Sequence, residues 1–308
     1  MQSPARQIFG RLFDAPYLLL SLTSLFWAGN IVLGRYAAGH VPPVALSFIR
    51  WTVAFLILIV FAWPFLKRDW TKIRQHLGIM LILTLAGITI YNSMAYWGLQ
   101  YTQAINALLI TSAHPLLVAG WAFILYRERL TVWQTIGIAL SLAGVMTILT
   151  RGDLSALRDV RFNIGDIVFF SAQIIYSFYA TLIKSRPNIH PVSFLAFTIG
   201  VGAVMLSPVY ATEVALGINF TLDLKAFLIL AYISIFPSLL AYLFFNRGIE
   251  LIGPNRAAPF YHLIPIFGSA LAIVFLGERP ELFHAAGYAL VLAGIFIGTR
   301  GHQRTAEV

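Results

Sequence analysis

Residues 98–149 read GLQYTQAINALLITSAHPLLVAGWAFILYRERLTVWQTIGIALSLAGVMTIL, and residues 247–297 read RGIELIGPNRAAPFYHLIPIFGSALAIVFLGERPELFHAAGYALVLAGIFI. A shift of 150 residues aligns these two stretches with 12 identities over residues 98–151. Leu and Ala match often by chance in an apolar chain, so the Gly, Pro and Glu-Arg matches carry the most weight. These are Gly98 with Gly248, Pro115 with Pro265, Glu128 with Glu278, Arg129 with Arg279, Gly137 with Gly287, and Gly144 with Gly294. The sequence therefore predicts a duplicated unit.

Apolar residues dominate the whole chain. Of its 308 residues, 59% are hydrophobic and 11% are charged, whereas a soluble domain is about 45–50% apolar and about 25% charged. A surface this apolar must face lipid. The formal charge of +9 is spread in short groups between apolar runs, which disfavours a nucleic-acid partner. The chain has no Cys, which excludes disulfides, thiolate metal sites and a Cys nucleophile.

Apolar segments long enough to cross a membrane recur along the chain. A bilayer core about 30 Å thick needs about 20 helical residues, and ten segments approach that length. The sequence thus predicts an all-α integral membrane protein with ten transmembrane helices. They cover residues 15–35, 43–63, 77–98, 103–125, 132–149, 163–184, 191–210, 226–248, 256–276 and 283–300.

Lys and Arg are unevenly shared between the two sets of connecting segments, and this bias predicts orientation. The set that includes both termini holds fourteen of the 21 basic residues: Arg6, Arg11, Lys67, Arg68, Lys72, Arg74, Arg127, Arg129, Lys184, Arg186, Arg247, Arg256, Arg300 and Arg304. The other set holds Arg35, Arg151, Arg158, Arg161, Lys225 and Arg279, and Arg50 lies within a span. Both termini and residues 67–75 are therefore predicted to be cytoplasmic, with residues 151–162 outside.

The repeat divides the chain into residues 1–150 and residues 151–308, each with five predicted spans. Because five is an odd number, the two copies must cross the membrane in opposite directions. Such inverted repeats are typical of secondary transporters, which bind substrate near the midplane between the halves. An inert membrane scaffold is the alternative, but a scaffold has no need of this symmetry.

These motifs resemble a known family. Residues 98–149 resemble the second half of an EamA domain, with its Tyr-Thr, mid-helix Pro, Glu-Arg and Gly-containing fifth helix, and residues 247–297 fit the same pattern. Residues 26–51, FWAGNIVLGRYAAGHVPPVALSFIRW, resemble the family's opening segment. The resemblance implies the drug/metabolite transporter superfamily: ten helices in a 5+5 inverted arrangement, usually exporters in the bacterial inner membrane. Within it, the chain is similar to the YddG-type amino-acid exporters.

Polar and aromatic residues form stripes on six predicted spans, three from each repeat. Polar groups within a membrane tend to face the bundle interior or a cavity, although they also serve as contacts between helices. We expect one central substrate cavity, with these candidate lining residues: Trp27, Asn30, Asn92, Tyr96, His114, Gln173, Tyr176, Ser238, Tyr242, Tyr261 and His262.

Two prolines occupy corresponding positions of the two repeats. Pro115 and Pro265 each remove a helical hydrogen bond and weaken or bend the helix, so they are candidate hinges. The single basic residue inside a span, Arg50, has three interpretations: it extends to the membrane surface, pairs with the first span or forms part of a gate. A structural role is the favoured one.

These patterns predict a secondary transporter rather than an enzyme, because no nucleophile–base pair or metal-ligand set stands out. The expected partners are a small-molecule substrate and the lipid bilayer, with no nucleic acid, cofactor or metal. The resemblance implies amino acids and their analogues, aromatic or hydrophobic ones first. A broad drug or dye exporter is the alternative, although the lack of Asp or Glu near any midplane disfavours permanent cations. A membrane enzyme or scaffold is a less favoured alternative.

Overall fold

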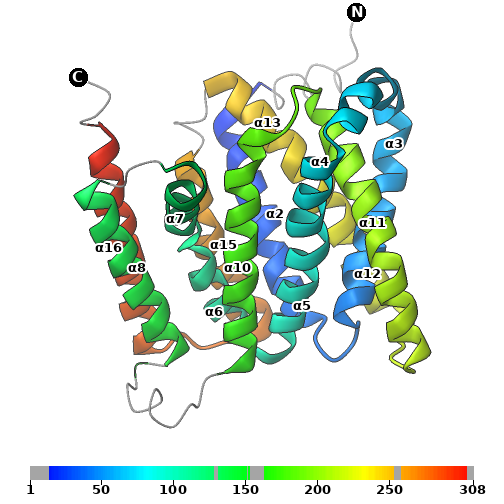
Figure 1. The fold of residues 1–308 in the computed structure, drawn as a ribbon. Coiled ribbons are helices and arrows are strands. Elements are labelled where there is room, and N and C mark those ends of the chain that lie inside the picture. Colours follow the sequence, from blue (N-terminus) through cyan, green and yellow to red (C-terminus); the bar gives the residue numbers. More distant parts are fainter. Residues whose placement is uncertain (1–13, 128–130, 151, 153–162, 253–257, 304–308) are drawn as a thin grey trace, which may run out of the picture.

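A computed structural model describes residues 14–127, 131–150, 152, 163–252 and 258–303. These residues form a bundle of helices, with no β-strand in the described part of the chain (Figure 1). In the first repeat the helices are α2 Pro16–Tyr36, α3 Pro43–Gln75, α4 Leu77–Thr84, η1 Leu85–Ile90, α5 Tyr91–Tyr101, α6 Ala104–Thr111, α7 His114–Tyr126 and α8 Val132–Leu149. In the second they are α10 Ile164–Leu182, η2 Ile183–Ser185, α11 Pro191–Ala215, α12 Leu224–Ile235, η3 Phe236–Leu240, α13 Ala241–Ile252, η4 Ala258–His262, α15 Leu263–Leu276 and α16 Leu282–Gln303.

Six helices of the described chain are long and apolar enough to cross a membrane, and a seventh is added if the bent pair α6–α7 counts as one span. Shorter apolar helices cover Thr135–Ile148, Phe260–Leu276 and Leu282–Gly294. Each of the ten predicted segments contains helix. The described part of the protein is therefore a multi-pass, all-helical membrane protein.

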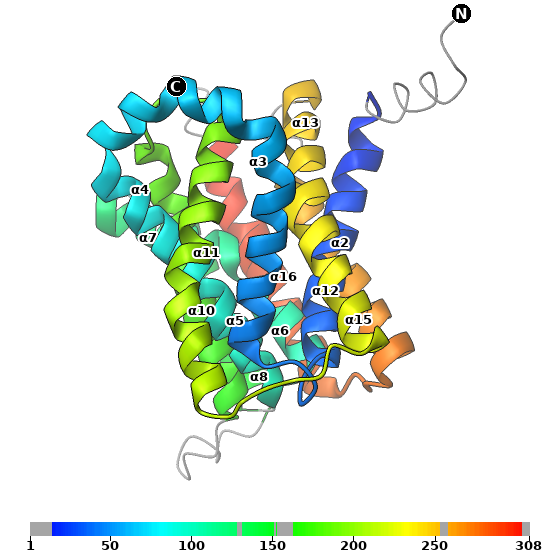
Figure 2. The same cartoon turned by 90° about the vertical axis from the view of Figure 1, so that its right-hand side faces the viewer.

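One predicted loop is instead helical. Residues 67–75 were expected between the second and third spans, but α3 continues as helix to Gln75. Pro64 lies inside this helix, and Figure 2 shows the end of α3 turning across the end of the bundle. An interior Pro removes one backbone hydrogen bond and bends the helix, so the polar continuation leaves the direction of the span without losing its helical structure.

The two repeats pack through equivalent pairs of helices. The first helix of repeat one, α2, packs against α13 and α15, and the first helix of repeat two, α10, packs against α5 and α7. Two further pairs each join equivalent helices of the two repeats, α3 with α11 and α8 with α16, and the two fourth spans meet where α6 packs against α15. This is the pattern that a two-fold relation between the copies produces.

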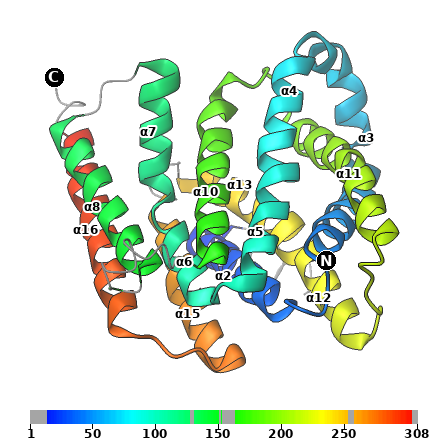
Figure 3. The same ribbon diagram turned by 60° about the horizontal axis from the view of Figure 1, so that its bottom comes forward.

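The last helices of the two repeats, α8 and α16, lie side by side at one edge of the bundle (Figure 3). A Cβ on Gly144 would lie 2.6 Å from the carbonyl oxygen of Gly287, and one on Gly294 would lie 2.5 Å from that of Gly137. Ser141 donates a hydrogen bond of 3.2 Å to the carbonyl of Val291. Residue numbers thus rise on one helix as they fall on the other, so these equivalent helices run antiparallel, as an inverted repeat requires.

Irregular helical turns occur at matching positions of the two copies. The third span of each repeat contains a π-helical segment, η1 in the first and η3 in the second. The fourth span of each is broken: α6 meets α7 at 43°, and the 3₁₀ turn η4 precedes α15. Such irregular turns are frequent at functional sites, and all of these adjoin the centre of the bundle.

Candidate functional site

A small cavity lies between the two repeats at the level of these irregular turns. Its volume is about 60 Å³. Helices of both repeats contribute its lining: Trp27, Asn30, Ile31, Arg50, Trp51, Gly87, Tyr91, Asn92, Thr111, His114, Gln173, Tyr176, Tyr242, Tyr261 and Ile264. We call this space the central cavity.

Arg50 of α3 forms the polar wall of the central cavity. Its Nε donates to Ser238 Oγ at 2.6 Å. Its Nη1 lies 2.7 Å from Tyr96 OH, 3.1 Å from Asn92 Oδ1 and 3.2 Å from Asn30 Oδ1. Four uncharged oxygens from three segments of the chain, α2, α5 and η3, therefore hold one buried guanidinium.

The π-helical turns are held by the same side chains. Asn92 Nδ2 donates to the carbonyls of Gly87 and Ile88, at 3.2 and 3.1 Å. Ser238 Oγ donates to the carbonyl of Ile233 at 2.6 Å. Backbone carbonyls without a regular helical partner need another donor, so these side chains stabilise the irregular turns and orient Arg50 at the same time.

Aromatic rings form a second part of the lining. The ring centroid of Trp27 lies 5.2 Å from that of Tyr261 and 5.9 Å from that of Tyr242. Tyr176 stacks on Tyr91 at 4.3 Å and lies 5.1 Å from the ring of His114. The cavity thus combines a cationic, hydrogen-bonding wall with an aromatic one.

A larger pocket of about 340 Å³ adjoins the central cavity. Five residues line both spaces: Trp27, His114, Tyr176, Tyr242 and Tyr261. The pocket extends along α10 and α13 to Arg186 and Asn246, toward the end of the bundle where α2 begins and α16 ends (Figure 1). We call this end the terminal end.

Polar contacts between the two repeats connect the helices at the opposite end. Glu278 accepts hydrogen bonds from the backbone N–H groups of Ala104 and Ile105, at 2.8 and 2.9 Å, at the start of α6. Asp166 accepts hydrogen bonds from Thr102 and Asn106. Carboxylates of the second repeat thus hold the beginning of the fourth span of the first repeat.

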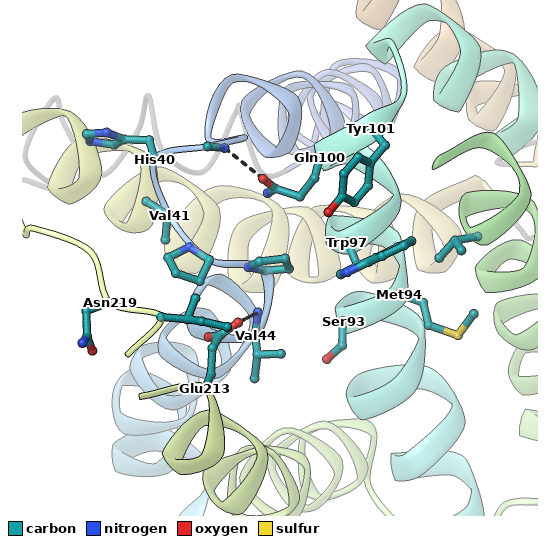
Figure 4. A pocket seen from close by; sticks show the side chains of 15 residues that line it. His40, Val41, Val44, Ser93, Met94, Trp97, Gln100, Tyr101, Glu213 and Asn219 are labelled. Carbon is teal, nitrogen blue, oxygen red and sulfur yellow. Dashed lines mark hydrogen bonds between the residues drawn. The ribbon is translucent and has the colours of Figure 1, made fainter. Parts of the chain in front are cut away.

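The opposite end also holds a pocket of about 620 Å³ (Figure 4), whose lining shares no residue with the central cavity. Glu213 accepts hydrogen bonds from the backbone of Val44 and Ala45 at its wall, and Gln100 accepts one from Gly39. Along α3, Val44 of this pocket and Arg50 of the central cavity are separated by about 9 Å of helix. The two spaces are therefore distinct, and the larger one lies at an end of the bundle.

At the same end of the bundle, the loop before α3 contacts the residue that precedes α12. The His40 ring lies 3.0 Å from the carboxylate of Asp223. The hydrogen bond from the backbone N–H of Ala226, followed by that from His40, lowers the pKa of the Asp223 carboxyl. The carboxylate therefore stays ionised as it caps α12 and connects that helix to the loop before α3.

The structure places most of the candidate lining residues together. Around the central cavity lie Trp27, Asn30, Asn92, His114, Gln173, Tyr176, Tyr242 and Tyr261. Tyr96 and Ser238 are buried and contact Arg50 without lining the cavity. His262 is half-buried and lines neither the cavity nor the adjoining pocket, because the 3₁₀ turn η4 directs its neighbour Tyr261 there instead. Whether these residues bind substrate remains a prediction.

The candidate hinge prolines lie just after breaks rather than inside continuous helices. Pro115 is in the first turn of α7, after α6 has ended at Thr111. Pro265 is in the first turn of α15, after η4. A helix accepts Pro in its first turn because the missing N–H has no intrahelical partner there. Both prolines therefore begin the second half of a broken span.

Seven lining residues were missing from the predicted site: Ile31, Arg50, Trp51, Gly87, Tyr91, Thr111 and Ile264. Arg50 had been assigned a structural role. Tyr91 directly precedes Asn92 in α5, so it lies off the helical face that Asn92 and Tyr96 share. Trp51 gives no signal in the sequence beyond its position next to Arg50.

The fold and this site together define a class: a helical membrane protein with two inverted repeats and a polar–aromatic cavity between them. The EamA-like transporter family matches residues 15–150 and again residues 163–300. The chain belongs to this family, and it carries the family's domain twice.

Relatives of similar length are named as transporters. The chain is 26% identical over 294 residues to an uncharacterized transporter, YyaM, of Bacillus subtilis (strain 168), covering 91% of this chain and 92% of the relative. It is 24% identical over 298 residues to a probable amino-acid metabolite efflux pump of Salmonella typhimurium, covering 94% and 97%. A crystal structure with 17% identity covers 94% of this chain and 98% of its own with a TM-score of 0.60; that likeness concerns the fold alone. These names support a transporter rather than an enzyme.

Proposed function

We propose that this protein exports small neutral or zwitterionic metabolites, amino acids with aromatic or hydrophobic side chains first, across the bacterial inner membrane. Transport proceeds by alternating access, with the two repeats moving against one another around the central cavity. The observation that carries the proposal is the cavity itself, a polar–aromatic space formed by both repeats. Inverted-repeat transporters bind substrate at this position.

The chemistry of the lining supports this substrate class over permanent cations. Among the described residues that line the central cavity and the adjoining pocket, none is Asp or Glu, whereas Arg50 and Arg186 are present. Tyr and Trp faces suit apolar side chains, and the amides of Asn30 and Gln173 suit the polar groups of an amino acid. The Salmonella relative named as an amino-acid metabolite efflux pump gives independent support.

The test is flux in proteoliposomes that contain the purified full-length protein. The panel comprises the twenty amino acids, a quaternary ammonium dye and a sugar phosphate. We expect flux of aromatic or aliphatic amino acids that is lost in Trp27→Ala and kept in Trp63→Ala, a matched change at a side chain 61% exposed on the bundle surface. Flux of the dye alone would favour a broad drug exporter, and flux of the sugar phosphate alone would exclude the proposed class.

Orientation forms part of the proposal, with both termini and residues 67–75 cytoplasmic. Because the chain has no Cys, single-Cys variants can be labelled in intact cells without a background. Gln75→Cys should react only with a membrane-permeant reagent. Ser155→Cys, which lies outside the described residues, should also react with an impermeant one. The reverse pattern would invert the proposed direction of transport.

A further inference from the structure

Arg50 places an unneutralised positive charge beside the central cavity. Arg50 is buried, with 4% of its surface exposed, and it is the one Lys or Arg among the described residues that line the central cavity. No carboxylate in the described part of the chain forms an ion pair with it. A buried charge is costly unless a partner of opposite sign compensates it. The four oxygens around Arg50 orient the charge but do not neutralise it.

One nitrogen of the guanidinium, Nη2, remains available. Arg carries five N–H donors in a planar fork. The hydrogen bonds of Nε and Nη1 go to Ser238, Asn30, Asn92 and Tyr96. Nη2 donates to no atom of the described residues, although Arg50 lines the cavity. The N–H groups of Nη2 can therefore donate to a carboxylate oxygen, and such charge-assisted hydrogen bonds are stronger than those between neutral groups.

Other buried polar atoms near the cavity also lack partners. Nδ1 of His114, Oε1 of Gln173 and Nε1 of Trp51 are each buried without a hydrogen bond, and all three residues line the cavity. Native proteins leave few such atoms unpaired, and each calls for an explanation. The indole N–H of Trp51 is a donor beside Arg50, while the oxygen of Gln173 is an acceptor.

We propose that Arg50 recognises a carboxylate of the transported molecule, so that the substrates are acids with an apolar body. The carboxylate binds Nη2 of Arg50, with the N–H of Trp51 as a second donor. Gln173 and His114 supply acceptors for a donor group such as an α-ammonium. This inference rests on the proposed function, and it restricts the proposed substrates to carboxylates, excluding amines and neutral amides.

The shape of the two connected spaces agrees with such a molecule. The central cavity of about 60 Å³ suits a small head group, and the adjoining pocket of about 340 Å³ suits a side chain. Phe194, Leu195 and Phe245 line only the larger pocket. An apolar group would therefore extend from the head group toward the terminal end, away from Arg50.

Four ligands that share a benzene ring and differ in head group separate the carboxylate from the rest of the molecule: 3-phenylpropionate, phenylalanine, phenylalaninamide and phenethylamine. Calorimetry or tryptophan fluorescence with the full-length protein in detergent measures their affinities. We expect the two carboxylates to bind at least about tenfold more tightly than the amide and the amine, as a charge-assisted hydrogen bond implies.

Variants then assign the preference to Arg50. Arg50→Gln should abolish the preference for carboxylates by weakening their binding about tenfold or more, and Arg50→Lys should restore part of it. Arg35→Gln is the matched control, because Arg35 contacts the carbonyls of Leu99 and Gln100 outside the cavity. It should leave the preference unchanged. Size-exclusion profiles show whether each variant is folded, and the wild-type preference is informative even if Arg50→Gln does not fold.

Each result bears on one of the two proposals. Equal affinity for acid and amide, a preference that survives in folded Arg50→Gln, or no binding of any carboxylate would overturn the role of Arg50. Arg50-dependent binding of 3-phenylpropionate without flux of any amino acid would support it while refuting amino-acid export. Amino-acid flux combined with equal affinities for phenylalanine and phenylalaninamide would support amino-acid export while refuting the role of Arg50.

Discussion

Substituting Gly144 by Ala tests the contact between the two repeats at α8 and α16. The added Cβ would lie 2.6 Å from the carbonyl oxygen of Gly287, 2.9 Å from Val291 and 3.0 Å from Leu290. Ordinary contacts of a Cβ begin at 3.4 Å, so the two helices must separate by roughly 0.8 Å. The nearest neighbour is backbone and has no rotamer with which to relieve the clash.

Two opposing terms set the expected magnitude. Overpacking in a close-packed interior costs about 1–3 kcal/mol, and the short contact with a backbone oxygen places this substitution in the upper part of that range, at about 2–3 kcal/mol. Replacing Gly by Ala within a helix stabilises the helix by up to about 1 kcal/mol, because Ala has the higher helix propensity. The net loss of stability is therefore about 1–2 kcal/mol, which corresponds to a fall of roughly 2–8 °C in the apparent melting temperature of a chain of this size. Gly294→Ala should behave alike, because its Cβ would lie 2.5 Å from the carbonyl of Gly137.

The assay is thermal unfolding of the purified protein in detergent, followed by intrinsic fluorescence. Gly120→Ala is the matched control, since a Cβ there meets nothing within 4 Å, and its melting temperature should stay the same or rise. Substrate affinity should be unchanged in all three variants, because α8 and α16 contribute no residue to the central cavity. Equal melting temperatures for all three would refute the antiparallel contact described here.

Three further predictions concern the site and its surroundings. Trp27→Ala should weaken substrate binding about tenfold or more with little loss of protein yield, because Trp27 lines both the central cavity and the adjoining pocket. Calorimetry compares this variant with Trp63→Ala, and equal substrate affinities of the two variants would show that Trp27 is not part of the site. Pro115→Ala and Pro265→Ala should slow flux by similar factors while leaving affinity intact, since both begin the second half of a broken span, and wild-type flux in both would contradict a hinge role. Glu278→Gln should lower the free energy of unfolding by about 1 kcal/mol, as the loss of a helix cap does, because the carboxylate accepts hydrogen bonds from two N–H groups of α6. The control Glu281→Gln, at an exposed residue of the same loop, should lower it less, and an equal loss in both variants would argue against the cap.

The helices and their duplication could be predicted because the signals are strong and local. A bilayer imposes a minimum length on every apolar segment, and the offset of 150 residues aligns Pro115 with Pro265 whatever the three-dimensional structure is. The irregular turns could not be predicted in the same way. The segment Leu85–Ile90 is as apolar as the helix around it and gives no signal of a π-helical turn. The turn is stabilised by the hydrogen bond from Asn92 to the carbonyl of Gly87, which can be seen only in the folded structure.

The candidate site was predicted in part for a related reason. Helical periodicity finds residues that share a face of one helix, so Trp27 and Asn30 were found together. It does not find what lies across from that face. The role of Arg50 depends on oxygens from three other spans, and a charged residue near the edge of a span suggests membrane-surface contact as readily as burial. Contacts between distant segments are the information that a single sequence lacks.

The duplication also places unlike side chains at equivalent positions of the central cavity. At the offset of 150 residues, three pairs of equivalent residues line the central cavity: Asn92 and Tyr242, Thr111 and Tyr261, and His114 and Ile264. In each pair the first repeat supplies the more polar side chain, and the second supplies an aromatic or aliphatic one. Equivalent positions keep the backbone symmetry that lets two halves exchange roles in alternating access. A molecule with one charged and one apolar end cannot match a symmetric site, so recognition of such a molecule requires the side chains, but not the backbone, to have diverged.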